Sequence, residues 1–383
     1  MTCKNILHLS HTDIRYDARI IKEMYVISNE FVDSEIQGIG IELDEKNKIS
    51  ELAYELDIVS LNLKSKRIKF LPKSIRHLLT LSEFFIKTIT CKKRNKKIDV
   101  IHCHDTVALP VALFLKISCK CKLIYDAHEL ESDRAGISKF MGKMVYLVEK
   151  YAWNKIDSFI TVSPEILSWY LQNFGNKKSE VILNSPFSKD FKLEKKKSNY
   201  LRDHFSIPSS HPIYIYVGFF TSGRGINSLI EIFKNEQSRS IVFLGYGNLD
   251  KTLKNAEQEF ENIHVHDAVT PEKVLEVSSS ADFGLCLLEN VSLSDYLSLP
   301  NKLFEYIFGD LLVLCSDFPA IRNFVYKYKC GLVCKNVNDI PSSMKTIENL
   351  RTNNHLNLNR LHKECSWEAQ EKKIVGLYNR LLK

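Results

Sequence analysis

The chain has 383 residues, of which 26% are charged and 44% are hydrophobic, and its formal net charge is +7. This length exceeds what one hydrophobic core usually holds, so two domains of roughly 150 to 200 residues are expected. No stretch reaches the ~18 consecutive apolar residues that span a bilayer, and an integral membrane protein is therefore not expected. The apolar run at residues 1–9 is too short for a secretory signal, which predicts a cytoplasmic protein.

Short apolar runs alternate with helical patterns along the chain, as in parallel sheets covered by helices. In the first part we expect strands at 6–9, 100–102, 122–125 and 158–162 and helices at 18–28 and 108–116. The rhythm restarts with strands expected at 213–218, 241–245, 263–266, 282–288 and 311–317 and helices at 226–233 and 253–260. The alternation predicts an α/β fold with two Rossmann-like domains that face each other across a cleft.

A segment rich in lysine, proline and serine separates the two series, at residues 185–212. This composition is typical of a connection between domains. We place an N-terminal domain at 1–190 and a C-terminal domain at 191–365. The tail, 366–383, repeats apolar residues at helical spacing and is expected to form an amphipathic helix that packs on another surface.

The segment 299–309 predicts a loop that turns into a helix near Asn301, with Glu305 one turn inside. Free amides at a helix start attract anions, and a carboxylate one turn further in can accept hydrogen bonds from hydroxyl groups beside that anion. A sugar nucleotide offers both groups. Glu305 also has a purely structural interpretation, because a glutamate in the first turn complements the helix dipole.

A loop bounded by Gly218 and Gly225 follows the first strand of the second series and carries Arg224. A guanidinium can bind two phosphate oxygens in a fixed fork, although a loop arginine is often a solvated surface residue. We expect Arg224, Lys302 and the amides near Asn301 to converge on a diphosphate.

An imidazole and two carboxylates follow the strand expected at 122–125, in the order Asp126, His128 and Glu129. Side chains that follow a strand lie at the edge of the sheet where ligands bind. His128 either contributes to a site there or bonds a backbone carbonyl at the strand end.

His102, His104 and Asp105 raise the possibility of a metal site. No third ligand with suitable spacing is evident, so no metal is expected and His102 is predicted to pack beneath the site. Cys119 and Cys121 form an isolated CxC, which is typical of ordinary reduced cysteines.

Much of the positive charge lies at residues 64–97, interleaved with apolar residues. Two interpretations stay open: a solvated helix face above a core stripe, or an amphipathic surface on anionic lipid. No nucleic-acid-binding motif accompanies the charge, so nucleic acid is not an expected partner. The basic residues are Lys64, Lys66, Arg67, Lys69, Lys73, Arg76, Lys87, Lys92, Lys93, Arg94, Lys96 and Lys97.

Taken in order, these motifs resemble the retaining family-4 glycosyltransferases of GT-B architecture, in particular the bacterial branch that builds capsule, O-antigen and exopolysaccharide. The resemblance runs over nearly the whole chain. The matching segments are 10–19 with Lys22 and Glu23, then 99–105, 125–129, 161–163, Asn184, 218–225, 299–309 and 366–368.

The resemblance implies a role for each matching residue of the second series. Arg224 would bind the donor diphosphate, with Gly218, Asn301 and Lys302 beside it, and Glu305 would bind the nucleotide ribose. The resemblance also implies that the domain at 1–190 binds the acceptor, that the domain at 191–365 binds the nucleotide sugar, and that the closing helix crosses back onto the N-terminal domain.

In the first series, the resemblance places His128 near the donor sugar and the reaction centre, as the catalytic residue. Further cleft candidates are Arg15, Arg19, Asp126 and Glu129.

Three departures from the family pattern stand out. Leu297 occupies the place of the first Glu of the E-x7-E motif, and Phe219 stands where an arginine is common, which removes one phosphate cation. Lys302 is expected to compensate for that loss. The glycine-rich loop usual after the first strand is absent.

These motifs predict an enzyme that transfers a sugar, with retention, from a nucleotide diphosphate sugar to a saccharide or polyprenyl-diphosphate-linked acceptor in surface polysaccharide synthesis. A UDP-sugar is the favoured donor, and no metal or other cofactor is expected. Contact of residues 64–97 with anionic lipid would place the protein at the inner face of the cytoplasmic membrane. The alternatives are a nucleotide-sugar epimerase of the same architecture and a catalytically inactive scaffold subunit.

Overall fold

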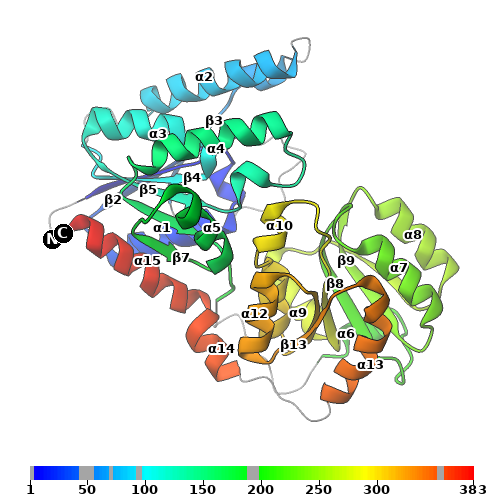
Figure 1. Ribbon diagram of the computed structural model, residues 1–383. Coiled ribbons are helices and arrows are strands. Elements are labelled where there is room, and N and C mark those ends of the chain that lie inside the picture. Colours follow the sequence, from blue (N-terminus) through cyan, green and yellow to red (C-terminus); the bar gives the residue numbers. More distant parts are fainter. Residues whose placement is uncertain (1–3, 43–55, 69–71, 92–96, 188–197, 352–357) are drawn as a thin grey trace. The chain divides into compact units, whose positions relative to one another are not determined.

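The computed structural model describes residues 4–42, 56–68, 72–91, 97–187, 198–351 and 358–383. The chain divides into two compact units, unit 1 with residues 1–182 and 370–383 and unit 2 with residues 183–369. Each unit has its own parallel sheet (Figure 1), which confirms the expected pair of α/β domains. The boundary expected between residues 190 and 191 lies outside the described residues. Among the described helices, none has the length and apolar character that a membrane crossing requires.

In the described part of unit 1, seven parallel strands follow the order β3-β2-β1-β4-β5-β6-β7. The strands are β1 (Asn5–Leu9), β2 (Glu35–Ile41), β3 (Asp57–Leu61), β4 (Val100–His104), β5 (Lys122–Ala127), β6 (Ser158–Thr161) and β7 (Ser179–Val181). The helices are α1 (Ala18–Glu30), α2 (Lys73–Cys91), α3 (Asp105–Cys119), α4 (Lys139–Trp153) and α5 (Pro164–Phe174), with 3-10 turns at Ile14–Tyr16, Lys64–Arg67 and Glu131–Asp133. The central strands β1, β4 and β5 are almost wholly buried because helices cover the sheet.

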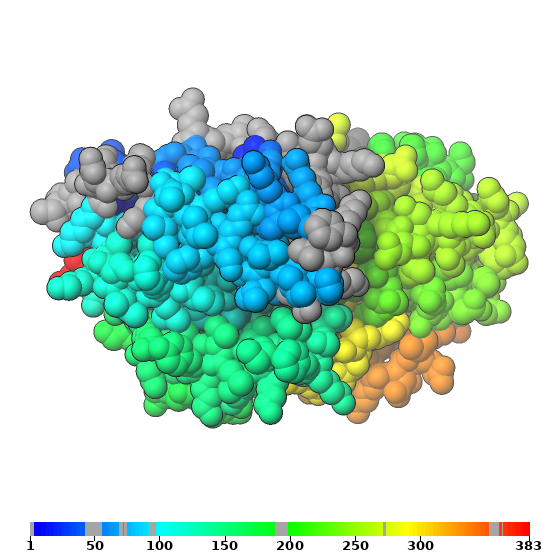
Figure 2. Space-filling model, turned by 90° about the horizontal axis from the view of Figure 1, so that it is seen from above, coloured from blue at the N-terminus to red at the C-terminus, as the bar shows by residue number. Residues whose placement is uncertain are grey.

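Three helices, α2, α3 and α4, form one layer of unit 1. α3 contacts both α2 and α4, and the rings of Phe85 on α2 and Phe114 on α3 lie 5.0 Å apart. Figure 2 shows these helices next to one another, α2 in blue, α3 in cyan and α4 in green. We refer to their outward side as the α2–α3–α4 face.

The closing helix α15 (Trp367–Leu382) returns to unit 1 (Figure 1), as predicted. Its apolar side chains Ile374, Leu377 and Tyr378 are buried. The Tyr378 ring lies 6.2 Å from the Phe31 ring at the end of α1. The amphipathic pattern of the tail therefore covers the sheet of unit 1.

In the described part of unit 2, six parallel strands follow the order β10-β9-β8-β11-β12-β13. The strands are β8 (Ile213–Phe220), β9 (Ser240–Gly247), β10 (Ile263–Asp267), β11 (Phe283–Cys286), β12 (Leu312–Ser316) and β13 (Gly331–Cys334). The helices are α6 (Tyr200–His204), α7 (Ile226–Asn235), α8 (Asp250–Glu259), α9 (Pro271–Ser279), α10 (Leu293–Leu297), α11 (Asn301–Phe308), α12 (Pro319–Tyr328), α13 (Ile340–Arg351) and α14 (Leu358–Cys365), with a 3-10 turn at Val337–Asp339.

Tyr306 anchors α11 to the sheet of unit 2. Its hydroxyl oxygen accepts a hydrogen bond from the Val217 N–H at 2.7 Å, and the hydroxyl donates to the Leu285 carbonyl at 3.3 Å. The ring packs against Gly284 of β11, where an added Cβ would lie 2.3 Å from Tyr306 Cγ. The absence of a side chain at Gly284 therefore sets how closely α11 approaches the strands.

We expect Gly284→Ala to lower the free energy of unfolding by about 1 to 3 kcal/mol, because the new methyl group overlaps the Tyr306 ring. Denaturant unfolding followed by circular dichroism measures this loss. The control is Gly376→Ala on α15, where the added Cβ meets only Arg380 Nη1 at 3.5 Å and a helical alanine is favoured. Equal stability of the two variants would contradict the packing argument.

Candidate functional site

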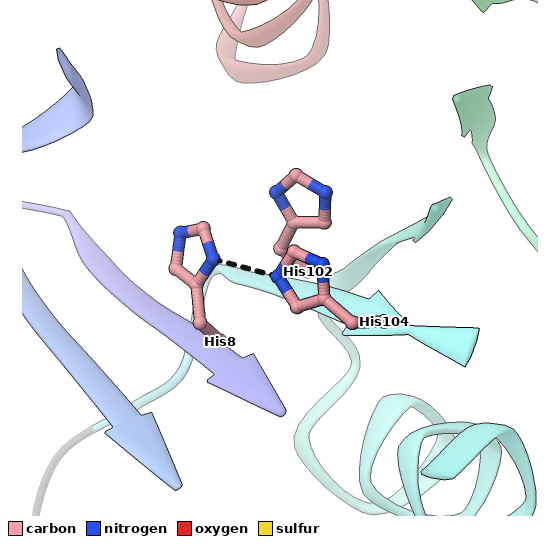
Figure 3. Close-up of side chains that lie close together, drawn as sticks. All are labelled: His8, His102 and His104. Atoms are coloured by element: carbon pink, nitrogen blue, oxygen red, sulfur yellow. Dashed lines mark hydrogen bonds between the residues drawn. The ribbon is translucent and has the colours of Figure 1, made fainter. Parts of the chain in front are cut away.

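Three histidines lie on the central strands of unit 1, His8 on β1 and His102 and His104 on β4 (Figure 3). His8 Nδ1 lies 3.1 Å from His104 Nε2, and His102 Nδ1 lies 2.9 Å from the Tyr378 hydroxyl oxygen. Burial lowers the pKa of all three, to about 3 for His102. They are therefore neutral, and the prediction that His102 packs in the interior is confirmed.

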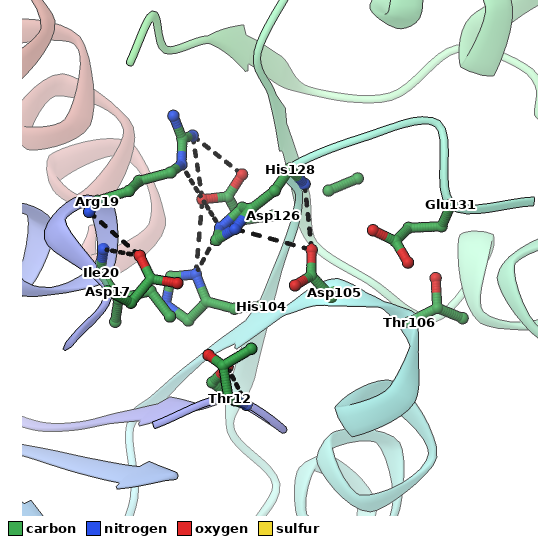
Figure 4. Close-up of polar contacts among 12 residues, drawn as sticks. Thr12, Asp17, Arg19, Ile20, His104, Asp105, Thr106, Asp126, His128 and Glu131 are labelled. Atoms are coloured by element: carbon green, nitrogen blue, oxygen red, sulfur yellow. Dashed lines mark hydrogen bonds and ion pairs between the residues drawn. The ribbon is translucent and has the colours of Figure 1, made fainter. Parts of the chain in front are cut away.

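A buried ion pair joins α1 to β5 (Figure 4). Arg19 Nη2 donates to both carboxylate oxygens of Asp126 at 3.1 Å, and Arg19 Nη1 donates to the Ile182 carbonyl at 2.9 Å. Asp17 caps α1 by accepting a hydrogen bond from the Arg19 N–H, which places Arg19 in the first turn. Four residues later, Glu23 brings its Oε1 within 3.2 Å of Arg19 Nε.

Glu23 is the unusual member of this group, because its side chain is fully buried and neither of its oxygens makes a hydrogen bond within the described structure. Burial raises the pKa of Glu23 to about 8, and the negative charge of Asp126 acts in the same direction while Arg19 opposes it. Glu23 is therefore mostly protonated at neutral pH, and Asp126 is the ionised partner of Arg19.

His128 lies at the edge of this cluster, with 18% of its side chain exposed. Its Nε2 is 3.2 Å from His104 Nδ1 and 3.4 Å from Asp126 Oδ2. Its backbone N–H donates to Asp105 Oδ1 at 3.3 Å, and its Nδ1 is 3.8 Å from the same oxygen. Burial alone would lower the pKa of His128, but the charges of Asp105 and Asp126 raise it to about 10. His128 is thus a charged imidazolium.

Asp105 is a site residue that the sequence analysis considered only as a metal ligand. It opens α3 with a φ of 59°, a left-handed conformation that residues other than glycine seldom adopt. Backbone strain of this kind persists where the surroundings determine the conformation, often at functional sites. In this conformation the Asp105 carboxylate faces both the backbone and the ring of His128.

Four buried groups, Glu23, His102, His104 and Asp126, lie close enough together to be considered as metal ligands. The rings of His102 and His104 stack at 17° with their centroids 4.4 Å apart. Both ring nitrogens of His104 already face another imidazole, with His8 Nδ1 at 3.1 Å and His128 Nε2 at 3.2 Å. Arg19 also occupies both oxygens of Asp126. This arrangement does not fit a metal centre, and metal-independent activity stays a prediction.

The structure separates the remaining cleft candidates of unit 1. Arg15 pairs with Asp13, with Nη2 and Oδ2 at 2.8 Å. Glu129 is exposed. Arg19 and Asp126 are buried, so they support His128 from within instead of lining a surface.

The positive groups of unit 2 gather near the start of α11. Arg224 lies in the loop before α7 and brings its Nη1 within 3.3 Å of Asp295 Oδ1 on α10. Lys302, in the first turn of α11, places its Nζ 3.7 Å from the centroid of the Tyr216 ring on β8. That nitrogen is buried and makes no hydrogen bond within the described structure.

Electrostatics link Lys302 to the other predicted residues. Burial lowers the pKa of Lys302 to about 8; the charge of Arg224 also lowers it, whereas Cys286 and Glu305 raise it. Arg224, Lys302 and Glu305 thus share one neighbourhood in unit 2, with Asn301 exposed at the first position of α11. Their binding roles stay predictions.

Two residues of this neighbourhood were missed by the sequence analysis. Tyr216 supports Lys302 from β8, and Asp295 orients Arg224. Asp295 is itself fixed by Ser292, whose hydroxyl donates to Asp295 Oδ2 at 2.6 Å. A serine three residues before an aspartate is a helix-start signal, but it does not reveal which cation the carboxylate meets.

Comparisons with known proteins agree with this architecture. Residues 52–185, which contain the β4–α3–β5 part of the histidine cluster, match the family model Glycosyltransferase Family 4. The chain is 26% identical over 197 residues to an uncharacterised glycosyltransferase of Methanocaldococcus jannaschii, covering 48% of this chain and 50% of that protein. It is 25% identical over 266 residues to the chitobiosyldiphosphodolichol beta-mannosyltransferase of Candida albicans, covering 63% and 58%. The chain spans little more than half the length of these curated relatives.

Solved structures match over the whole chain. Sucrose-phosphate synthase from Thermosynechococcus elongatus has a TM-score of 0.76 at 16% identity, covering 99% of both chains. Anabaena HepE in complex with UDP-glucose has a TM-score of 0.73 at 12% identity, covering 98% of this chain and 100% of HepE. The chain has the GT-B fold.

We expect Asp105→Asn to lower the pKa of His128 from about 10 by roughly one to three pH units, because the amide keeps the shape and loses the charge. Nuclear magnetic resonance titration of the histidine ring measures this change. The control is Asp133→Asn, which removes the charge of an exposed carboxylate in the 3-10 turn Glu131–Asp133. This variant should leave the pKa of His128 unchanged. A His128 titration that does not move in Asp105→Asn would disprove the pairing.

Proposed function

We propose that the protein is a glycosyltransferase that moves a sugar from a nucleotide diphosphate sugar, with a UDP-sugar favoured, to a saccharide or polyprenyl-diphosphate-linked acceptor. The observation that carries the proposal is the shared neighbourhood of Arg224, Lys302 and Glu305 at the start of α11, in a GT-B fold. The family 4 match over residues 52–185 supports it. The complex of HepE with UDP-glucose supports the choice of donor. The name of the Candida relative, which contains a lipid-linked saccharide, supports the choice of acceptor.

In this proposal, unit 2 binds the donor. The guanidinium of Arg224, the ammonium of Lys302 and the first amides of α11 bind the diphosphate, and Glu305 accepts hydrogen bonds from the ribose hydroxyls. Positive groups already in place stabilise the charge that grows on the leaving nucleotide diphosphate. Protein cations thereby supply the charge that a divalent ion supplies elsewhere, so the proposed reaction is metal-independent.

His128 acts from unit 1 in the proposed mechanism. As an imidazolium with a pKa of about 10, it donates hydrogen bonds and has no free basic nitrogen at neutral pH. It is therefore suited to orient sugar hydroxyl or phosphate oxygens and unsuited to act as a general base. The acceptor proton then passes to the leaving phosphate, as in the retaining course that the family resemblance implies.

The biological setting completes the proposal: surface polysaccharide synthesis of the capsule or O-antigen type, at the inner face of the cytoplasmic membrane. The sequence motifs support this branch, and the basic segment 64–97 supports contact with anionic lipid. Within that segment Lys64, Lys66 and Arg67 are exposed. The basic residues at 69 and at 92–96 lie outside the described residues.

Lys302→Ala should weaken UDP binding at pH 7 by about 1.5 to 3 kcal/mol, roughly tenfold or more, because one charged hydrogen-bond donor is lost. In the unchanged protein, affinity should fall as the pH rises through about 8, where Lys302 loses its proton; the variant should lack this dependence. Calorimetric titration with UDP measures both effects. The control is Lys254→Ala, an exposed lysine on α8. Unchanged affinity in Lys302→Ala would refute the role.

Nucleotide release from candidate donors, with and without a polyprenyl-diphosphate saccharide, tests the reaction itself. We expect release to require the acceptor and to fall by roughly 100-fold or more in Arg224→Ala, as when a group that stabilises transition-state charge is removed. Release without acceptor would favour the epimerase or hydrolysis. Donor binding without turnover would favour the scaffold subunit, which the departures Leu297 and Phe219 make a specific alternative.

A further inference from the structure

The helix α4 leaves a row of large apolar side chains in solvent. Phe140 is 72% exposed and Tyr151 66% exposed, with Met144 and Leu147 also exposed between them. Their spacing of four, three and four residues places them on one side of the helix. The opposite side of α4 is buried, with Gly142, Ala152 and Trp153 packed against unit 1. The exposed row is therefore a second apolar side of α4 that no described part of unit 1 covers.

The neighbouring helices extend this row. α3 exposes Phe114 and Ile117, and α2 exposes Ile75, Leu78, Leu79 and Ile86. Because α3 contacts both α2 and α4, these side chains lie on neighbouring helices, whose outward side is the α2–α3–α4 face in Figure 2. Scattered exposed apolar residues are ordinary, whereas a group spread over three adjacent helices marks an interaction surface.

The charge of this face has one sign. Lys139, Lys143 and Lys150 flank the apolar row of α4 and are exposed. The helices α3 and α4 contain two acidic residues, Asp105 and Glu149, and both are buried. Glu149 accepts hydrogen bonds from the hydroxyls of Tyr125 and Tyr170 in the interior.

α2 likewise presents positive charge, because its carboxylate is paired. Its one acidic residue, Glu83, is held by Lys87 Nζ at 2.8 Å and by the backbone N–H groups of Lys64 and Ser65. The α2–α3–α4 face therefore presents apolar groups and cations, with its carboxylates buried or paired.

We propose that the α2–α3–α4 face docks on an anionic lipid bilayer and that the row Phe140, Met144, Leu147 and Tyr151 of α4 enters the interface between headgroups and acyl chains. The apolar row provides contact with the acyl region, and the flanking lysines attract anionic headgroups. This inference deepens the lipid-contact part of the proposed function and shifts the main contact from residues 64–97 to α4.

The charge pattern favours lipid over a second copy of the chain. A symmetric contact would place Lys139, Lys143 and Lys150 of one copy against the same face of the other copy, where α3 and α4 offer no exposed carboxylate to pair with them. A bilayer of anionic lipid satisfies both the cations and the apolar side chains.

Flotation of the full chain with vesicles of phosphatidylglycerol and phosphatidylcholine tests the proposal. We expect the double variant Met144→Glu with Leu147→Glu to bind about tenfold more weakly or worse, because two apolar groups become anions at a negative surface. Both positions are exposed, so folding should be preserved, as circular dichroism will show. The matched control is Val32→Glu, an exposed apolar residue of unit 1 outside this face.

Replacing Lys139, Lys143 and Lys150 with glutamine should weaken binding to anionic vesicles and leave the weak binding to pure phosphatidylcholine unchanged.

Equal flotation of the Met144→Glu, Leu147→Glu variant and the unchanged protein would overturn the proposal. The proposal would also be overturned if light scattering showed a dimer of the unchanged protein that the Met144→Glu, Leu147→Glu variant does not form.

Titration with UDP separates the lipid contact from the donor site. A variant that loses flotation and still binds UDP has lost only the lipid contact. If the proposed donor site is wrong, UDP binding fails while flotation of the unchanged protein is still observed.

Discussion

The ion pair between Arg19 and Asp126 is the interaction on which the interior of unit 1 depends. An unpaired guanidinium at this depth would be very costly, and the pair is sustained because Asp126 offers both oxygens while the Ile182 carbonyl takes a further N–H. At neutral pH the charges balance. Arg19 and His128 are positive, Asp105 and Asp126 are negative with a lowered pKa, and Glu23 is kept neutral by burial.

Unit 2 has the opposite electrostatic character at its predicted site. Lys302 has a buried nitrogen without a hydrogen-bond partner in the described structure, and burial lowers its pKa to about 8. Arg224 is only partly compensated, because it meets Asp295 through one nitrogen at 3.3 Å. An arrangement that holds cations in place before a ligand arrives is suited to an anion. The charge balance of unit 1 instead suits it to hold one imidazolium in a fixed orientation.

The sequence was sufficient for the two α/β domains and for the alternation of strands and helices within them, although it gave no sign of β2, β3, β7 and β13. Lys302 and Glu305 are three residues apart on one helix, so periodicity alone places them together. Arg19 and Asp126 are separated by 107 positions, and no local pattern specifies such a partner. The left-handed backbone of Asp105 also has no signature in its residue type. The apolar residues Phe140, Met144, Leu147 and Tyr151 of α4 have the spacing of side chains that face a core. Only the structure shows that they are exposed to solvent.

Phe219 shows how a departure from the family pattern is accommodated in three dimensions. Its side chain is exposed and makes an edge contact with Tyr246, with ring centroids 5.3 Å apart. A phenylalanine ring carries no positive charge that could bind a phosphate. Its carbonyl accepts a hydrogen bond from the Tyr216 hydroxyl, and the ring of Tyr216 supports Lys302. In the proposed site, Lys302 at the start of α11 supplies the cation that an arginine in the place of Phe219, on β8, would supply. A lysine held on an aromatic ring acts as a point charge and lacks the bidentate fork of arginine, so in the proposed site Arg224 alone provides directional recognition of the diphosphate.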